Sequence, residues 1–216
     1  MHLTSALLIL LQSCLSTAAP RVSSALPIRD ALVPPTVVST SFSGSGCPQG
    51  TTKAQTAGLW EHFSFDLPSF KAKTGPSSDV AERTVNCQVH LNFGGPTTGW
   101  QFALKDHWSR GHFEIAGAGV TLTQYLTVYF SQDPANTATT VQSVSSVDDL
   151  AVSKDLRLHT SIPEGALIWS PCNGNGILNV NFRIAFSGAT SSVTAYYGAS
   201  KNSSVSEQWG WTWRSC

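Results

Sequence analysis

Short segments in which apolar and polar residues alternate recur along most of this chain, and Gly, Pro, Asn and Ser separate them. A period of two places successive side chains on opposite faces of a strand, so each segment is expected to have one buried and one solvated face. The sequence shows no convincing helical period. The pattern predicts an all-β fold, an antiparallel β-sandwich that is jelly-roll-like or a flattened barrel and is bridged by disulfides.

Residues 85–104 carry the clearest of these patterns and predict a β-hairpin. Apolar residues alternate with amides and a histidine over 85–93, a Gly/Pro turn follows, and Trp100, Phe102 and Leu104 continue the apolar face. Further strands are expected at 59–65, 112–116, 120–131, 156–160, 166–170, 177–187, 193–197 and 208–214. The polar stretches 71–83 and 133–149 are expected to be surface loops.

The first residues predict export from the cell. An apolar run over residues 6–11 is too short to span a bilayer, and small residues at Ser16 and Ala18 allow signal-peptidase cleavage after Ala18. We therefore expect a signal peptide at 1–18, a flexible leader at 19–43, which is rich in Ser, Pro, Val and Ala, and a single secreted domain at 44–216.

Cleavage would remove Cys14 and leave Cys47, Cys87, Cys172 and Cys216. An even number of cysteines in a secreted chain predicts two disulfides, and four cysteines allow three pairings. Chain order favours Cys47–Cys87 with Cys172–Cys216, and the other two pairings stay open. Asn202 begins an Asn-Ser-Ser sequon, which predicts glycosylation.

The low charge of the chain restricts its partners. Charged residues make up 12% of the sequence and Lys+Arg equal Asp+Glu at 13 each, so the basic excess that nucleic-acid binding requires is missing. No later stretch is apolar enough for a membrane span, and a monomer is expected. No cofactor and no metal site are expected: C-x-x-C pairs are absent, and His62, His90, His107 and His112 are interpreted as scattered surface histidines.

Several of these stretches resemble a known family. They are Gly44–Gly50, Arg83 with Asn86-Cys87, Gly99–Phe102, Ser170-Pro171-Cys172, Leu178–Asn181 and Trp213–Cys216. They look like the secreted fungal family called domain of unknown function 4360, and the resemblance covers residues 43–216. It implies a secreted, cysteine-bridged single domain, and it supplies no catalytic residues.

The polar strand faces suggest a site. Amides hydrogen-bond sugar hydroxyls and aromatic rings stack on sugar C–H faces. The predicted ligand-binding face has Trp60 and His62 beside it and consists of Gln88, His90, Asn92, Gln101, Asn179, Asn181 and Arg183. An ordinary solvated sheet face is the alternative. Trp209, Trp211 and Trp213 share one face of the closing strand and are expected in the core.

The leading hypothesis is a non-catalytic extracellular binding or effector-like module that acts on a glycan or another component of a cell wall or host surface. The competing hypothesis is a glycan hydrolase that pairs Glu61 or Asp66 with Asp106 or Glu114. A G-x-S-x-G elbow is absent, and no catalytic residue is assigned. A purely structural wall component is the third possibility.

Overall fold

The computed structural model of the chain describes residues 32–54, 60, 63–95, 99–146, 150–188, 193–201 and 203–216. Two short 3-10 helices of this part are η2 (Val80–Arg83) and η3 (Glu164–Ala166). The strands are β1 (Thr36–Ser43), β2 (Lys53–Ala54), β3 (Phe63–Leu67), β4 (Ala72–Thr74), β5 (Thr84–Gly94), β6 (Trp100–Ala116), β7 (Thr121–Phe130), β8 (Asp133–Ser145), β9 (Val152–Ser161), β10 (Gly176–Ser187), β11 (Thr194–Gly198) and β12 (Val205–Ser215).

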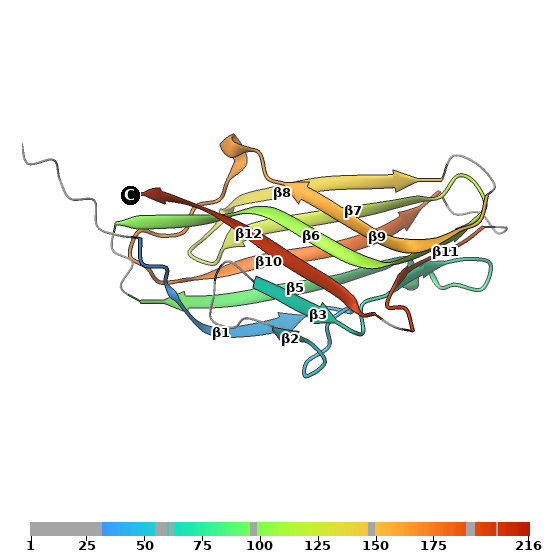
Figure 1. Ribbon diagram of the computed structural model, residues 1–216, viewed down its shortest axis with the longest axis horizontal. Coiled ribbons are helices and arrows are strands. Elements are labelled where there is room, and N and C mark those ends of the chain that lie inside the picture. Colours follow the sequence, from blue (N-terminus) through green and yellow to red (C-terminus); the bar gives the residue numbers. More distant parts are fainter. Residues whose placement is uncertain are drawn as a thin grey trace, which may run out of the picture. The chain divides into compact units, whose positions relative to one another are not determined.

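The strands form two antiparallel sheets, which confirms the predicted fold class. The five-stranded sheet has the order β1-β5-β10-β7-β8. The seven-stranded sheet has the order β2-β3-β12-β6-β11-β4, and β9 pairs with the other edge of β6. In Figure 1, β12 runs obliquely across β10 and β5 of the other sheet.

The core lies between the sheets and is rich in aromatic side chains. Phe70 stacks on Phe182 with ring centroids 4.7 Å apart, and Phe93 meets Phe102 edge to face at 4.8 Å. Each such buried ring contributes about 1.5–3 kcal/mol by leaving water. Trp209 is buried, and Trp211 and Trp213 pack against the core, which confirms the interior placement expected for this strand.

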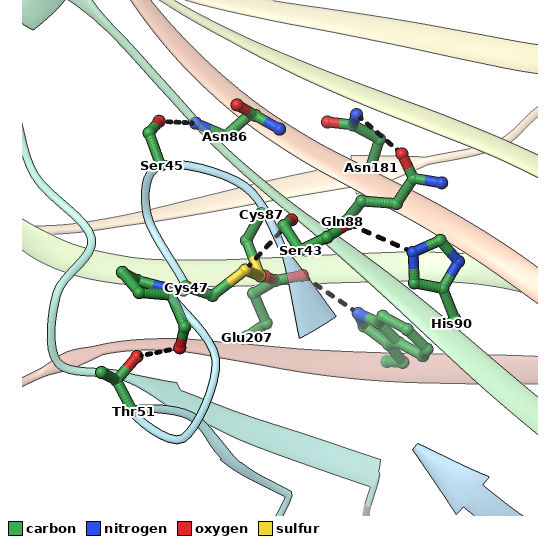
Figure 2. Close-up of a disulfide and its surroundings, with 12 residues drawn as sticks. Ser43, Ser45, Cys47, Thr51, Asn86, Cys87, Gln88, His90, Asn181 and Glu207 are labelled. Atoms are coloured by element: carbon green, nitrogen blue, oxygen red, sulfur yellow. Dashed lines mark hydrogen bonds between the residues drawn. A yellow bond between two sulfur atoms is a disulfide. The ribbon is translucent and has the colours of Figure 1, made fainter. Parts of the chain in front are cut away.

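Two disulfides close the domain with the pairing that chain order favoured. Cys47 bonds to Cys87 at the start of β5, and Cys172 bonds to Cys216 at the end of the chain. Figure 2 shows the first bridge beneath the glycine-rich entry that precedes it in the chain. There Gly46 donates its N–H to the carbonyl of Asn86 at 2.8 Å, so this segment is tied to β5 by both a covalent and a hydrogen bond.

The predicted hairpin of residues 85–104 is wrong. β5 pairs with β1 and β10 in the five-stranded sheet, whereas β6 pairs with β12, β9 and β11 in the other. Both strands turn an apolar face to the same interior, so the connection crosses from one sheet to the other. Alternation reveals which side of a strand is buried, and it does not reveal which strand is its neighbour.

Other boundaries also differ from the sequence expectations. The stretch 133–149 was expected to be a loop, yet β8 occupies Asp133–Ser145 as the edge strand of its sheet, with most of its residues polar and at least partly exposed. The stretch 71–83 contains β4 and η2, and 166–170 is not a strand. The sheet begins at Thr36, so β1 lies within the segment expected to be a flexible leader.

Candidate binding sites on the outer faces of the two sheets

The outer face of the five-stranded sheet gathers the predicted ligand-binding residues, except Gln101. On β5 and β10, His90 pairs with Asn179, Gln88 with Asn181, and Asn92 with Ile177 in the antiparallel register. Arg183 follows on the same face with its guanidinium carbon 4.1 Å above the ring of Tyr125 on β7. The period of two in the sequence was enough to predict that these side chains point to the same side of their strands. They share one face because β5 and β10 are neighbours in the sheet.

These side chains hydrogen-bond mainly to one another. His90 contacts the side-chain oxygen of Asn179 at 2.7 Å and the hydroxyl of Ser43 at 3.1 Å. Gln88 donates to the hydroxyl of Tyr129 at 3.0 Å and accepts a longer bond from Asn181 at 3.5 Å; Figure 2 shows this part of the face. Asn179 is buried, and much of its hydrogen-bonding capacity is already used by partners within the sheet.

Gln101 does not belong to this face, which corrects the predicted set. It lies on β6 in the other sheet, donates its amide to the carbonyl of Ser170 and accepts a 2.9 Å bond from Arg214. Its role is to anchor the segment that leads to Cys172. The error follows from the hairpin prediction, which had placed β5 and β6 in one sheet.

A β-bulge decides what the seven-stranded sheet shows to solvent. Gly210 of β12 pairs with Asp106 and Trp211 pairs with Leu104, so the register skips Lys105. Such an extra residue reverses the side to which the following residues point. Phe102 and Leu104 face the core before the bulge, and His107 and Ser109 do so after it. The outward positions are then Trp108, Arg110, His112 and Glu114.

Three hollows adjoin one another along these outward positions of β6. The first, of ≈ 510 Å³, is lined by Trp108, Gln208 and Ser206, and shares Arg110 and Asp155 with the second. The second, of ≈ 670 Å³, shares Glu114 and Tyr196 with the third, of ≈ 620 Å³. We call this row of three adjoining hollows the β6 groove. From Trp108 to Ala116 it follows the strand for about 26 Å at about 3.3 Å per residue.

An aromatic side chain stands at one end of the β6 groove. The Trp108 indole stacks on the imidazole of His159 with centroids 4.8 Å apart and planes 7° apart. The nitrogen of His159 contacts Asp106 at 2.8 Å, which orients the imidazole. A Cβ atom at position 210 would come within 3.1 Å of the Trp108 ring. The glycine therefore leaves room for the indole to lie across the neighbouring strand.

Charged groups occupy the middle of the β6 groove. Arg110 donates to Asp155 at 2.7 Å, and this bond, with a smaller contribution from His112, lowers the pKa of the Asp155 carboxyl. Burial, reinforced by the charge of Glu114, raises the pKa of the Tyr196 hydroxyl. Perturbed groups collected in one hollow are a physical indication of a functional site.

Ser153, His112 and Asp155 also make contacts in the order of a catalytic triad. The hydroxyl of Ser153 lies 3.2 Å from Nε2 of His112, and Nδ1 lies 3.4 Å from Asp155. Nε2, however, is also 3.0 Å from Glu114, and a nitrogen that donates to a carboxylate cannot at the same time accept the serine proton. Asp155 is bound more closely by Arg110, so the geometry favours a binding role.

The other sequence candidates are dispersed. Asp66 accepts a 3.4 Å bond from Ser204, and Asp106 contacts His159, whereas Glu114 alone among the described hydrolase candidates lines the β6 groove. His107 is fully buried, so its interpretation as a surface histidine is wrong. Trp60 is buried in the core, away from solvent. Glu61, His62 and Asn202 lie outside the described residues, as does the predicted signal peptide.

No group of three or more metal-ligating side chains occurs among the described residues. The same part of the chain contains no helix with the length and apolarity needed to cross a membrane.

Sequence reasoning missed most of the β6 groove. The sequence analysis considered Glu114 only as a hydrolase candidate and His112 only as a metal candidate. It did not consider Trp108, Arg110 or Asp155 as binding residues. The local signal was a run of alternating Trp, Arg, His and Glu at positions 108–114. The sequence could not predict that these side chains point to solvent. The preceding apolar residues Trp100, Phe102 and Leu104 also have even numbers, and an uninterrupted period of two would place all even-numbered residues on the buried face.

The fold and its bridges define a disulfide-bridged β-sandwich domain of the kind found outside cells. The chain belongs to the family described as Domain of unknown function (DUF4360), which matches residues 34–216. The resemblance seen in the sequence is thereby confirmed.

An uncharacterized secreted protein of Arthroderma benhamiae is 30% identical to this chain over 148 residues, or 68% of this chain. The chain spans 58% of the length of that relative. With two disulfides and a secreted relative, this protein is extracellular, as its sequence predicted.

Two solved structures are distantly similar. TmCBM61 in complex with beta-1,4-galactotriose covers 79% of this chain and 88% of its own, at 8% identity and a TM-score of 0.25. The enzymatically active domain of bacteriophage CBA120 tailspike protein 4 covers 82% of this chain and 19% of its own, at 10% identity and a TM-score of 0.19. Likenesses at these TM-scores carry no argument about function.

Proposed function

We propose that this protein is a non-catalytic extracellular module that binds a glycan chain of a cell wall or host surface in the β6 groove. The observation that supports the proposal is the row of three adjoining hollows that share lining residues between Trp108 and Tyr196. An elongated depression with aromatic rings and closely spaced donors and acceptors suits a polymer of hydroxyl-rich units.

The energetics support modest affinity. Stacking a sugar ring on Trp108 removes on the order of 100 Å² of apolar surface from water, which contributes about 2.5 kcal/mol at about 25 cal/mol per Å². Hydrogen bonds to Arg110, Asp155 or Gln208 add about 0.5–1.5 kcal/mol each. With three such bonds the gross sum is about 4–7 kcal/mol, and because association itself has an entropic cost, a dissociation constant of about a millimolar is expected for a single sugar unit.

Binding is favoured over hydrolysis by the state of the carboxylates. A glycoside hydrolase requires a carboxylic acid whose pKa is raised, so that it can protonate the leaving oxygen. In the β6 groove the pKa of Asp155 is shifted in the opposite direction by Arg110. Glu114 is engaged by His112 at 3.0 Å. The carboxyl groups of Asp155 and Glu114 are therefore bound to Arg110 and His112, which suits ligand binding better than acid catalysis.

The test uses the secreted protein with intact disulfides, a panel of soluble and insoluble polysaccharides, and isothermal titration for any polymer that is retained. Trp108→Ala should weaken binding roughly 70-fold, the equivalent of the stacking contribution above. Tyr129→Ala, on the outer face of the five-stranded sheet, is the matched variant and should leave binding unchanged.

If Tyr129→Ala and not Trp108→Ala abolishes binding, the site is the amide-rich face predicted from the sequence. If no polysaccharide binds at millimolar concentration of its repeating unit and the protein is retained in a wall fraction, the structural role replaces the proposal.

A further inference from the structure

Two arginines face each other at the Trp108 end of the β6 groove. Arg110 of β6 and Arg157 of β9 are directly opposite in the antiparallel register and line the same hollow. Like charges at opposite positions of neighbouring strands are destabilising unless they are compensated. An anion beside each guanidinium would relieve this repulsion.

Only one of the two has such a partner within the described residues. Asp155 lies 2.7 Å from Arg110 and is held there at the centre of the groove. Arg157 is exposed, and no carboxylate of the described chain contacts its guanidinium. The hollow thus contains a guanidinium that is free to bind a ligand, beside an aromatic ring.

The neighbours of Arg157 restrict the ligand that it can take. An arginine offers paired N–H donors that match the two oxygens of a carboxylate. The Trp108 indole, fixed by His159, offers a flat apolar surface in the same hollow. Asp155 adds a negative charge close by, which penalises a doubly charged group such as a phosphate monoester more than a singly charged one.

We propose that this end of the groove binds the carboxylate of an acidic sugar, so that the ligand is a polysaccharide containing uronic acid units. The sugar ring lies on Trp108 while its carboxylate accepts hydrogen bonds from Arg157. This inference rests on the proposed function, since it specifies which glycan the β6 groove takes.

The experiment compares an oligogalacturonate with its carboxyl-reduced counterpart of equal length, by isothermal titration at 50 and 500 mM NaCl. The wild-type protein should bind the acidic oligomer at least tenfold more tightly at low salt, and the difference should shrink at high salt. Arg157→Gln should weaken binding of the acidic oligomer about tenfold and leave binding of the neutral one unchanged. Lys154→Gln, which removes the same charge from an exposed position of β9 that lines none of the three hollows, is the control and should have no effect.

Three outcomes would overturn the inference. The first is equal affinity for both oligomers, with both lost in Trp108→Ala; this leaves the proposed glycan binding intact and refutes only the acidic class. The second is an Arg157→Gln variant that binds the acidic oligomer as the wild type does. The third is a sulfated oligosaccharide that binds as tightly as the carboxylate with the same dependence on Arg157. Loss of the proposed function would look different, because neither oligomer would then bind in a manner sensitive to Trp108→Ala.

Discussion

A buried histidine–glutamate contact lies beneath the β6 groove, and its removal provides a stringent test of the structure. Nε2 of His107 on β6 lies 2.9 Å from Oε2 of Glu207 on β12, and both side chains are fully buried at 0% exposure. The indole of Trp209 donates to the same Glu207 oxygen at 3.2 Å. Within the described residues, Nδ1 of His107 and Oε1 of Glu207 have no further hydrogen-bond partner.

These contacts allow the magnitude to be estimated. His107→Leu leaves the Glu207 carboxylate buried with the Trp209 N–H as its remaining partner, and loss of one member of a buried pair costs about 3–5 kcal/mol. The double variant, His107→Leu with Glu207→Leu, removes both polar groups and should be less destabilised than His107→Leu alone, since apolar replacement of a buried pair is often neutral.

Urea unfolding with the disulfides intact measures these differences as a double-mutant cycle. The midpoint for His107→Leu should fall by about 1–2 M urea, and the double variant should recover most of that loss. Gln208→Leu, at the adjacent exposed position of β12, is the control and should change stability by less than about 0.5 kcal/mol. A cost below about 1 kcal/mol for His107→Leu, or a double variant as unstable as the sum of the singles, would refute the buried pair.

Two titrations provide further predictions. The pKa of the Asp155 carboxyl is lowered chiefly by its bond to Arg110, so Arg110→Gln should raise that pKa toward the ordinary value of about 3.9, measured by NMR pH titration; an unchanged pKa would show that the bond does not persist in solution. Burial raises the pKa of the Tyr197 hydroxyl, so its stabilising contribution is fully present below the ordinary tyrosine pKa of about 10 and is lost as the pH rises above that value toward the higher pKa of the folded state. Tyr197→Phe should therefore lose less stability between pH 9 and 11 than the wild type in urea unfolding, and parallel curves for Tyr197→Phe and the wild type would contradict this account.

The predicted amide face shows how far alternation can be trusted. His90 and Asn179 do lie on one surface, because each belongs to a strand whose apolar residues alternate without interruption. The pairing of these strands joins residues far apart in the chain, and no local pattern encodes it. Gln101 was misplaced for that reason: it shares the β-period of its segment but belongs to the other sheet.

The sequence by itself determined the fold class, the extracellular compartment, the disulfide cysteines and the buried side of most strands, because these depend on composition and on a local period of two. The tertiary structure alone decided the candidate site. At Lys105 the β12 register skips one residue of β6, and from there onward Trp108, Arg110 and their alternate neighbours point to solvent while His107 enters the core. A bulge is a property of two paired strands, so its position, and with it the β6 groove, emerges only when the sheets are assembled.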